Sequence, residues 1–127
     1  MEWKKKEYDY NDKLIFEGEY LNGKRWNGKG FDINGRLEFE IINGNGKGKE
    51  YNKGELIFEG EYLNGERWNG KVKEYDNGEL EFEGEYLNGK RNGKGKEYYD
   101  DGKLKFEGEY LKGKEVEMEK NIILMVN

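Results

Sequence analysis

The chain has 127 residues, of which 33% are hydrophobic and 40% are charged, and its formal net charge is −5 at pH 7. It contains no Cys, His, Ser or Thr, which excludes disulfides, imidazole and thiolate metal ligands, and every hydroxyl or thiol nucleophile except Tyr. Lys and Glu alternate closely and the balance is acidic, so nucleic acid is not expected as a partner.

The first 13 residues are predicted to be half of a repeat that caps the fold. Residues 6–8 read Lys-Glu-Tyr, as do residues 49–51 and 96–98, which lie in the second halves of complete repeats. The segment lacks the hydrophobic run of a signal peptide, and no stretch reaches the roughly 20 apolar residues of a membrane span. The expectation is a soluble, cytoplasmic protein.

Residues 14–114 contain about four and a half copies of one unit. The copies begin at Leu14, Leu37, Leu56, Leu80 and Leu104. A period of about 24 residues is typical of stacked arrays, in which each unit buries its apolar face against its neighbours. Residues 1–127 are therefore expected to form a single repeat domain.

The copy at residues 80–103 indicates how one unit folds. Its first residues alternate between apolar or glycine positions and glutamates, which predicts a half-buried strand over residues 80–86. Two Asn-Gly steps then predict a turn, residues 94–98 read as a second strand, and Asp-Asp-Gly turns the chain into the next copy. Each repeat is thus one β-hairpin, and the predicted fold is all-β: an elongated, single-layer antiparallel meander of tandem hairpins.

The charges of the hairpin are expected to form a solvated face. Glu83 and Glu85 of the first strand can oppose Lys94 and Lys96 of the second, and such cross-strand pairs contribute roughly 0.2–1 kcal/mol each. One question stays open, because Tyr98 and the glycines of its strand cannot both face inward in a regular strand. Either the glycines leave room for aromatic rings of the facing strand, or a bulge shifts the register.

Residues 115–127 are predicted to be a C-terminal capping segment. An open repeat sheet has an exposed terminal edge, and the end of this chain becomes wholly apolar. The segment is expected to cover its own sheet edge, or that of a second copy in a dimer. The residues expected to do so are Ile122, Ile123, Leu124 and Val126.

Aromatic side chains are the candidate partner-binding residues. Trp26 and Trp68 occupy equivalent extra positions next to an Arg in two hairpin loops, and Trp is enriched in interface hot spots. The alternative is that each Trp folds back over its own hairpin. The recurring tyrosines are candidates too, although the core is the more frequent place for such residues; they are Tyr20, Tyr62, Tyr86 and Tyr110.

The repeat resembles the MORN repeat, whose pattern runs aromatic-x-Gly-x-aromatic, then Gly-Lys, then Gly-x-Gly, then a turn glycine. In the best copy, the places of this pattern are occupied by Phe82, Gly84, Tyr86, Gly89, Lys90, Gly93, Gly95 and Gly102. In the first copy they are occupied by Phe16, Gly18, Tyr20, Gly23, Lys24, Gly28 and Gly30. The second copy departs from the pattern at residues 40–42, and Val72 replaces a glycine in the third.

The resemblance implies a twisted open sheet that serves as a scaffold, a dimerisation element or a docking surface for a helix or an extended peptide. It also implies a possible role in phosphoinositide binding or membrane attachment, and a bacterial branch resembles antitoxin-like proteins. An engineered repeat scaffold would have the same pattern. The main hypothesis is a non-enzymatic scaffold that binds another protein or itself.

Two further functions were weighed against this hypothesis. The Gly-rich residues 43–49 carry two lysines and could form an anion-binding nest, which is the basis of the phospholipid alternative; the net negative charge opposes it. Glutamate pairs such as Glu17 and Glu19 recur in several copies, whereas a catalytic pair needs one singular environment. No catalytic residue, metal site or cofactor is therefore predicted.

Overall fold

The computed structural model describes residues 4–119 and 122–125, with side chains up to residue 116. The described chain is all-β and contains no helix. It forms two compact units, which divide between Trp68 and Asn69. The predicted all-β meander of hairpins is confirmed.

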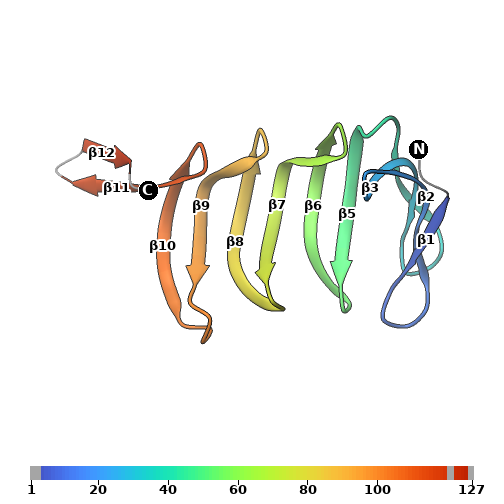
Figure 1. The fold of residues 1–127 in the computed structure, drawn as a ribbon, viewed down its shortest axis with the longest axis horizontal. Helices are drawn as coiled ribbons and strands as arrows, with labels where there is room; N and C mark the ends of the chain where they lie inside the picture. The colour runs from blue at the N-terminus through green and yellow to red at the C-terminus, as the bar shows by residue number, and fades with distance from the viewer. Residues whose placement is uncertain (1–3, 120–121, 126–127) are drawn as a thin grey trace. The chain divides into compact units, whose positions relative to one another are not determined.

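Unit 1 contains six complete strands, which Figure 1 shows as successive antiparallel hairpins. Four of them form one sheet in chain order: β1 (Lys5–Tyr8), β2 (Leu14–Leu21), β3 (Lys24–Phe31) and β4 (Leu37–Ile41). The other two, β5 (Gly46–Asn52) and β6 (Glu55–Leu63), pair with each other. The next strand, β7 (Glu66–Asp76), begins in unit 1 and continues into unit 2.

Unit 2 continues the same pattern, with each strand antiparallel to the one before it (Figure 1). Its strands after β7 are β8 (Glu79–Leu87), β9 (Lys90–Tyr98), β10 (Leu104–Leu111), β11 (Lys114–Glu119) and β12 (Ile122–Met125). Within the predicted capping segment, the backbone of β12 pairs with β11. The side chains of Ile122, Ile123 and Leu124 and the whole of Val126 lie outside the described residues, so the capping role stays a prediction.

Both mechanisms considered for fitting the glycines and tyrosines operate. The register shifts by a bulge after the glutamate of Lys-Glu-Tyr, so that Glu50 lies opposite Phe58 whereas Tyr51 lies opposite Leu56. The glycines also make room for aromatic rings, because a Cβ at Gly95 would lie 2.8 Å from the Phe82 ring. The ladder is regular from Gly48 to Glu50, so the glutamate faces the side of the buried phenylalanines by ordinary alternation, and the bulge displaces only the tyrosine that follows.

The charge ladder is present but its register differs from the prediction at one pair. Glu83 lies opposite Lys96 as predicted, whereas Glu85 lies opposite Asn92. Gly93 has a positive φ of 74°, and the extra residue at this bulge displaces Lys94, which lies opposite Glu109 of the other neighbouring strand.

The sheet of β1–β4 ends at the degraded second copy, so the predicted single sheet is interrupted there. The copy is four to five residues shorter than the complete copies and lacks their Gly-Glu-Tyr sequence, and β4 is only five residues long. Side chains span the junction between β4 and β5: the Phe39 ring lies against Gly48, and Arg25 donates a hydrogen bond from Nη1 to the Lys49 carbonyl oxygen at 2.6 Å. Side-chain packing thus replaces the missing backbone ladder.

The hairpin turns predict one stabilising substitution. Their first central residue has φ between 51° and 53° at Asn22, Asn43, Asn64, Asn88 and Lys112. Asn tolerates this left-handed conformation better than Lys, for which it is strained. We expect Lys112→Asn to stabilise the protein by up to roughly 1 kcal/mol, measured as a rise in thermal midpoint.

The matched control is the reverse substitution in the preceding hairpin, Asn88→Lys. It leaves in place the backbone N–H of residue 88, which donates to Asn69 Oδ1 at 2.9 Å, so only the turn preference changes. Asn88→Lys should lower the midpoint, and equal midpoints for both variants and the parent would contradict the assignment of strain.

Candidate functional site

The charged groups that the fold brings together most closely form a repeated cluster of Glu, Tyr and Arg, which we call the triad. The glutamate ends the second strand of one repeat, and the tyrosine and arginine flank the hairpin turn of the next. Three triads are present in the described residues: Glu7–Tyr20–Arg25, Glu50–Tyr62–Arg67 and Glu74–Tyr86–Arg91.

The three triads share one hydrogen-bonding pattern. In the second, Tyr62 donates from its hydroxyl to Glu50 Oε2 at 2.6 Å, and Arg67 donates from Nε to the same oxygen at 3.0 Å. Arg67 also donates from Nη2 to Glu50 Oε1 at 2.8 Å, so the arginine holds the carboxylate with two parallel hydrogen bonds. Such bidentate, charge-assisted pairs are the strongest hydrogen bonds of this class.

Each triad arginine also lies over a phenylalanine ring of the core. The distances from the guanidinium carbon to the ring centroid are 4.4 Å for Arg25 and Phe16, 5.2 Å for Arg67 and Phe58, and 4.2 Å for Arg91 and Phe82. All three rings are fully buried. The arginine therefore joins the apolar core to the carboxylate through a cation–π contact and an ion pair.

The triad surroundings favour the charged carboxylate and the neutral phenol. Burial opposes ionisation of Glu7 and Glu50, but the hydrogen bonds and charges of Arg25 and Arg67 outweigh it, so the pKa of each carboxyl is lowered. Burial and the adjacent glutamate raise the pKa of Tyr20 and Tyr62. These directions are those of a stable ion pair.

The second and fifth copies have no complete triad. The second lacks all three residues, and the fifth has a glutamate in place of the arginine. In the second copy, Ile41 takes the place of the tyrosine and is 1% exposed; no arginine or glutamate stands at the other two places. In the fifth copy Glu97 and Tyr110 are present, but Glu115 stands where the arginine is expected. Sequence reasoning missed the triad because it assigned these glutamates to the solvated face. The signal was the joint occurrence of the three residues at fixed spacing.

The predicted partner-binding tyrosines belong mostly to the core. Tyr20, Tyr62 and Tyr110 are 8%, 6% and 3% exposed, and Tyr86 is half-buried and bonded to Glu74 at 2.8 Å. Burial and the triad hydrogen bonds leave these tyrosines little exposed surface, and partner binding by them stays a prediction.

The predicted partner-binding tryptophans keep part of their surface. Trp26 and Trp68 are both half-buried. The Trp26 ring lies against the two following turns, because a Cβ would approach it to 2.6 Å at Gly44 and to 3.5 Å at Gly65. Its carbonyl oxygen accepts a hydrogen bond from the Gly44 N–H at 2.7 Å. A binding role for the two indoles stays a prediction.

One comparison with known proteins identifies the repeat. Residues 82–103 match the model of the MORN repeat family. The chain contains a MORN repeat. The matched segment includes the best copy of the pattern that the sequence shows, and the resemblance is confirmed there. The comparisons with curated proteins and with solved structures found no match.

The Gly-rich residues 43–49 between the first two full MORN-like hairpins do not form an open nest. The N–H groups of Asn43, Gly44 and Asn45 donate to Asn27 Oδ1, the Trp26 carbonyl and the Ile42 carbonyl. Residues 46–49 belong to β5, which pairs with β6. Because these turn amides already have acceptors, they offer no preformed anion site.

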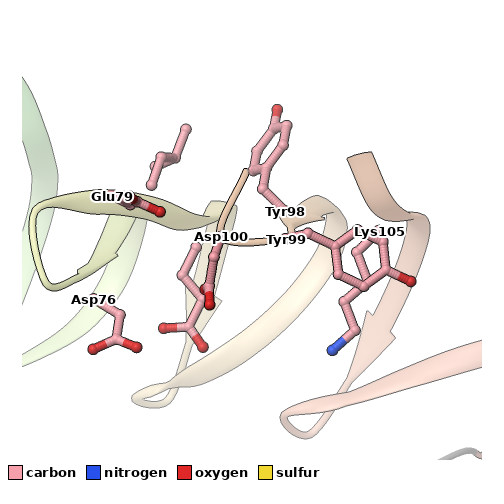
Figure 2. A pocket seen from close by; sticks show the side chains of 8 residues that line it. Asp76, Glu79, Tyr98, Tyr99, Asp100 and Lys105 are labelled. Atoms are coloured by element: carbon pink, nitrogen blue, oxygen red, sulfur yellow. The ribbon is translucent and has the colours of Figure 1, made fainter. Parts of the chain in front are cut away.

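A shallow hollow lies in unit 2, at the turns that connect successive MORN hairpins (Figure 2). It is lined by Asp76, Glu79, Leu80, Glu81, Tyr98, Tyr99, Asp100 and Lys105. The Tyr98 hydroxyl donates to Glu83 at 2.7 Å, and this hydrogen bond, with burial, raises the pKa of Tyr98 to about 12. Lys105 Nζ lies 5.9 Å from the centroid of the Tyr99 ring, so a cation of the chain itself already lies over this aromatic surface.

Within the described part of the chain, no group of three or more acidic side chains is arranged to hold a metal ion. Among the same residues there is no helix whose length and hydropathy would let it cross a membrane.

The triads differ in burial, and this predicts an order of stability effects. Arg25 is 8% exposed and also donates to the Lys49 carbonyl, so Arg25→Met leaves that carbonyl without its donor and removes the ion pair of the partly exposed Glu7, and it should cost about 2–3 kcal/mol. The side chains of Arg67 and Glu50 are 25% and 28% exposed, so Arg67→Met should cost only about 1–2 kcal/mol. Urea unfolding measures both, and equal costs would contradict the role of burial.

The lowered pKa of Glu50 predicts how the triad responds to acid. Its folded-state pKa lies below the ordinary value of 4.5, so its contribution is present above pH 4.5 and is lost as the pH falls through the folded-state value. Glu50→Gln should therefore be less stable than the parent at pH 7, with a difference that shrinks below about pH 4.5. The control is Glu19→Gln on an exposed side chain; a constant difference for Glu50→Gln across this range would refute the linkage.

Proposed function

We propose that this MORN-repeat chain is a non-enzymatic scaffold that binds another protein through its hairpin turns. The observation that carries the proposal is a recurring exposed apolar side chain just before the turn, here called the turn row. Its members are Ile42 and Leu63 in unit 1, which are 59% and 38% exposed, and Leu87 and Leu111 in unit 2, which are 51% and 44% exposed.

The turn row has the chemistry of a binding surface in unit 1. The half-buried Trp26 ring lies against Gly44 and Gly65, in the turns that directly follow Ile42 and Leu63. Apolar side chains that are exposed at the same place of successive repeats are positioned to form an apolar row, and contiguous exposed apolar surface is typical of protein interaction sites. An aromatic anchor fixed by its own fold is typical of the centre of a protein interface.

The charged residues support a binding role over a catalytic one. The triad glutamates are held by arginine and tyrosine, and Glu17 lies 3.4 Å from Lys4 and 3.9 Å from Lys6. The same arrangements recur from copy to copy. A repeated and neutralised carboxylate lacks the singular environment that separates the pKa values of an acid and a base.

Phospholipid binding is the weaker candidate. Its sequence basis was the Gly-rich segment at residues 43–49, and the turn amides there already donate to acceptors of the chain. The net charge of −5 also opposes attachment to an anionic membrane surface. Protein binding needs neither a free nest nor a basic surface.

The test is affinity capture with the turn row altered. The variant Ile42→Glu/Leu63→Glu places two charges in the turn row of unit 1, and captured proteins are compared with those of the parent. Any captured protein is then purified and its affinity measured directly. We expect the affinity to fall at least about tenfold, because a carboxylate buried in an apolar interface is costly.

The matched control places the same charges on exposed apolar residues at strand starts, in the variant Leu37→Glu/Leu56→Glu. These side chains are 58% and 37% exposed, so the solubility change is similar. It should retain the partner, and both variants should keep the parent's circular dichroism spectrum. Equal binding by the parent and the turn-row variant would refute the proposed surface, and sedimentation with phosphoinositide vesicles instead would favour the lipid candidate.

A further inference from the structure

The fifth copy replaces the triad arginine by an acid. Arg91 of the fourth copy lies opposite Tyr86, and at the same place in the fifth copy Glu115 of β11 lies opposite Tyr110 of β10. The glutamate of this cluster is Glu97, which accepts a hydrogen bond from the Tyr110 hydroxyl at 2.7 Å. Two carboxyls therefore share a place where the other triads hold one carboxylate and one guanidinium.

Cations from elsewhere compensate Glu97 only in part. Arg91 donates from Nη1 to Glu97 Oε1 at 3.0 Å, while its Nε and Nη2 remain bonded to Glu74 at 3.1 and 3.2 Å. Lys105 Nζ lies 3.9 Å from Glu97 Oε2. One guanidinium thus serves two carboxylates, and the fifth copy supplies none of its own.

We propose that Glu97 and Glu115 form an acid-sensitive latch, in which a proton held between the two carboxyls fastens the β10–β11 hairpin. Glu97 lies on β9 and Glu115 on β11, so when both groups are ionised they repel each other across β10. When one is protonated, it can donate a hydrogen bond to the other, as carboxyl pairs in close contact do. In the upstream triads an arginine, which stays charged, pairs with the glutamate instead, so those contacts do not depend on pH near neutrality.

The electrostatics of Glu115 have the direction that the latch requires. Burial, the charge of Glu97 and a hydrogen bond with Glu97 raise the pKa of Glu115 above its ordinary value. The charged groups that oppose this rise are Lys105 on β10 and Arg91 on β9. Tyr110, the remaining titratable neighbour, has a raised pKa because of burial and Glu97, and it stays neutral.

The raised pKa fixes the sign of the effect on stability. Between the ordinary value of 4.5 and the raised value, the folded state binds more protons at Glu115 than the unfolded state does. Stability from this group therefore increases as the pH falls through the raised value, and it is lost as the pH rises. This is opposite to the behaviour of Glu50, so acid should tighten the last hairpin while it weakens the upstream triads.

The test uses the full chain and a readout local to the hairpin. The carboxyl carbon of Glu115 is titrated by NMR, and the exchange protection of the Val116 amide, whose residue pairs with Glu109, is followed from pH 7.5 to 5. In the parent we expect the titration midpoint of Glu115 to lie above 4.5 and the protection factor to rise as the pH falls. In Glu97→Gln the midpoint should return toward 4.5.

Two substitutions of Glu115 separate the latch from a general effect of charge. Glu115→Gln removes the titrating group, so the protection of Val116 should no longer depend on pH in this range. Glu115→Arg restores the residue type of the upstream triads, so protection should be higher than in the parent at pH 7.5. An ordinary midpoint for Glu115, or a parent protection factor that is constant or falls toward pH 5, would overturn the proposal.

Discussion

The fold depends on a partly buried arginine held between a phenylalanine ring and a glutamate. A thin sheet has only one layer of side chains with which to exclude water from its core. Because only 33% of the residues are hydrophobic, apolar side chains alone form little of that layer. The arginine enlarges that layer, because its planar guanidinium covers an aromatic ring while its edge satisfies a carboxylate. The tyrosine hydroxyl donates one more hydrogen bond to the same carboxylate. A polar group is thereby made part of the core without an unpaired charge.

The glycines are the geometric condition for this arrangement. A side chain at Gly18 would meet the backbone of Asn27 at 2.0 Å, so opposite strands can approach only because both carry glycine there. That approach leaves the phenylalanine rings lying flat along the sheet, under the arginines. Regular alternation from the strand glycine brings the glutamate to the same face, two residues later, opposite the phenylalanine.

The sequence was sufficient for the class of fold and insufficient for the polar core. Alternation in residues 80–86 and the Asn-Gly turns predicted the hairpins, because strand periodicity and turn chemistry are local properties. The triad is not local: its glutamate lies 12 to 18 positions before the residues it binds, and the sequence left open whether the glycines or the tyrosine of its strand face inward. The break after β4 was also beyond sequence reasoning. A shortened copy indicates that part of the backbone ladder is lost, but it does not indicate that the side chains of Phe39 and Arg25 span the gap. The exposure of Ile42 and Leu63 could be predicted, because each directly follows an inward-facing residue of its strand and therefore points to the opposite face.

The triad also changes what should be regarded as one module of this protein. The repeating words of the sequence begin at leucines such as Leu14 and Leu80, yet each triad takes its carboxylate from before that boundary and its arginine from after it. The structural module that contains a complete triad therefore spans the boundary between two sequence repeats. A shortened chain that starts at Leu14 would keep a whole sequence repeat and still deprive Tyr20 and Arg25 of Glu7. Segments for transplantation or for building longer arrays are better cut between a triad arginine and the next triad glutamate, as between Arg67 and Glu74, where no triad is divided.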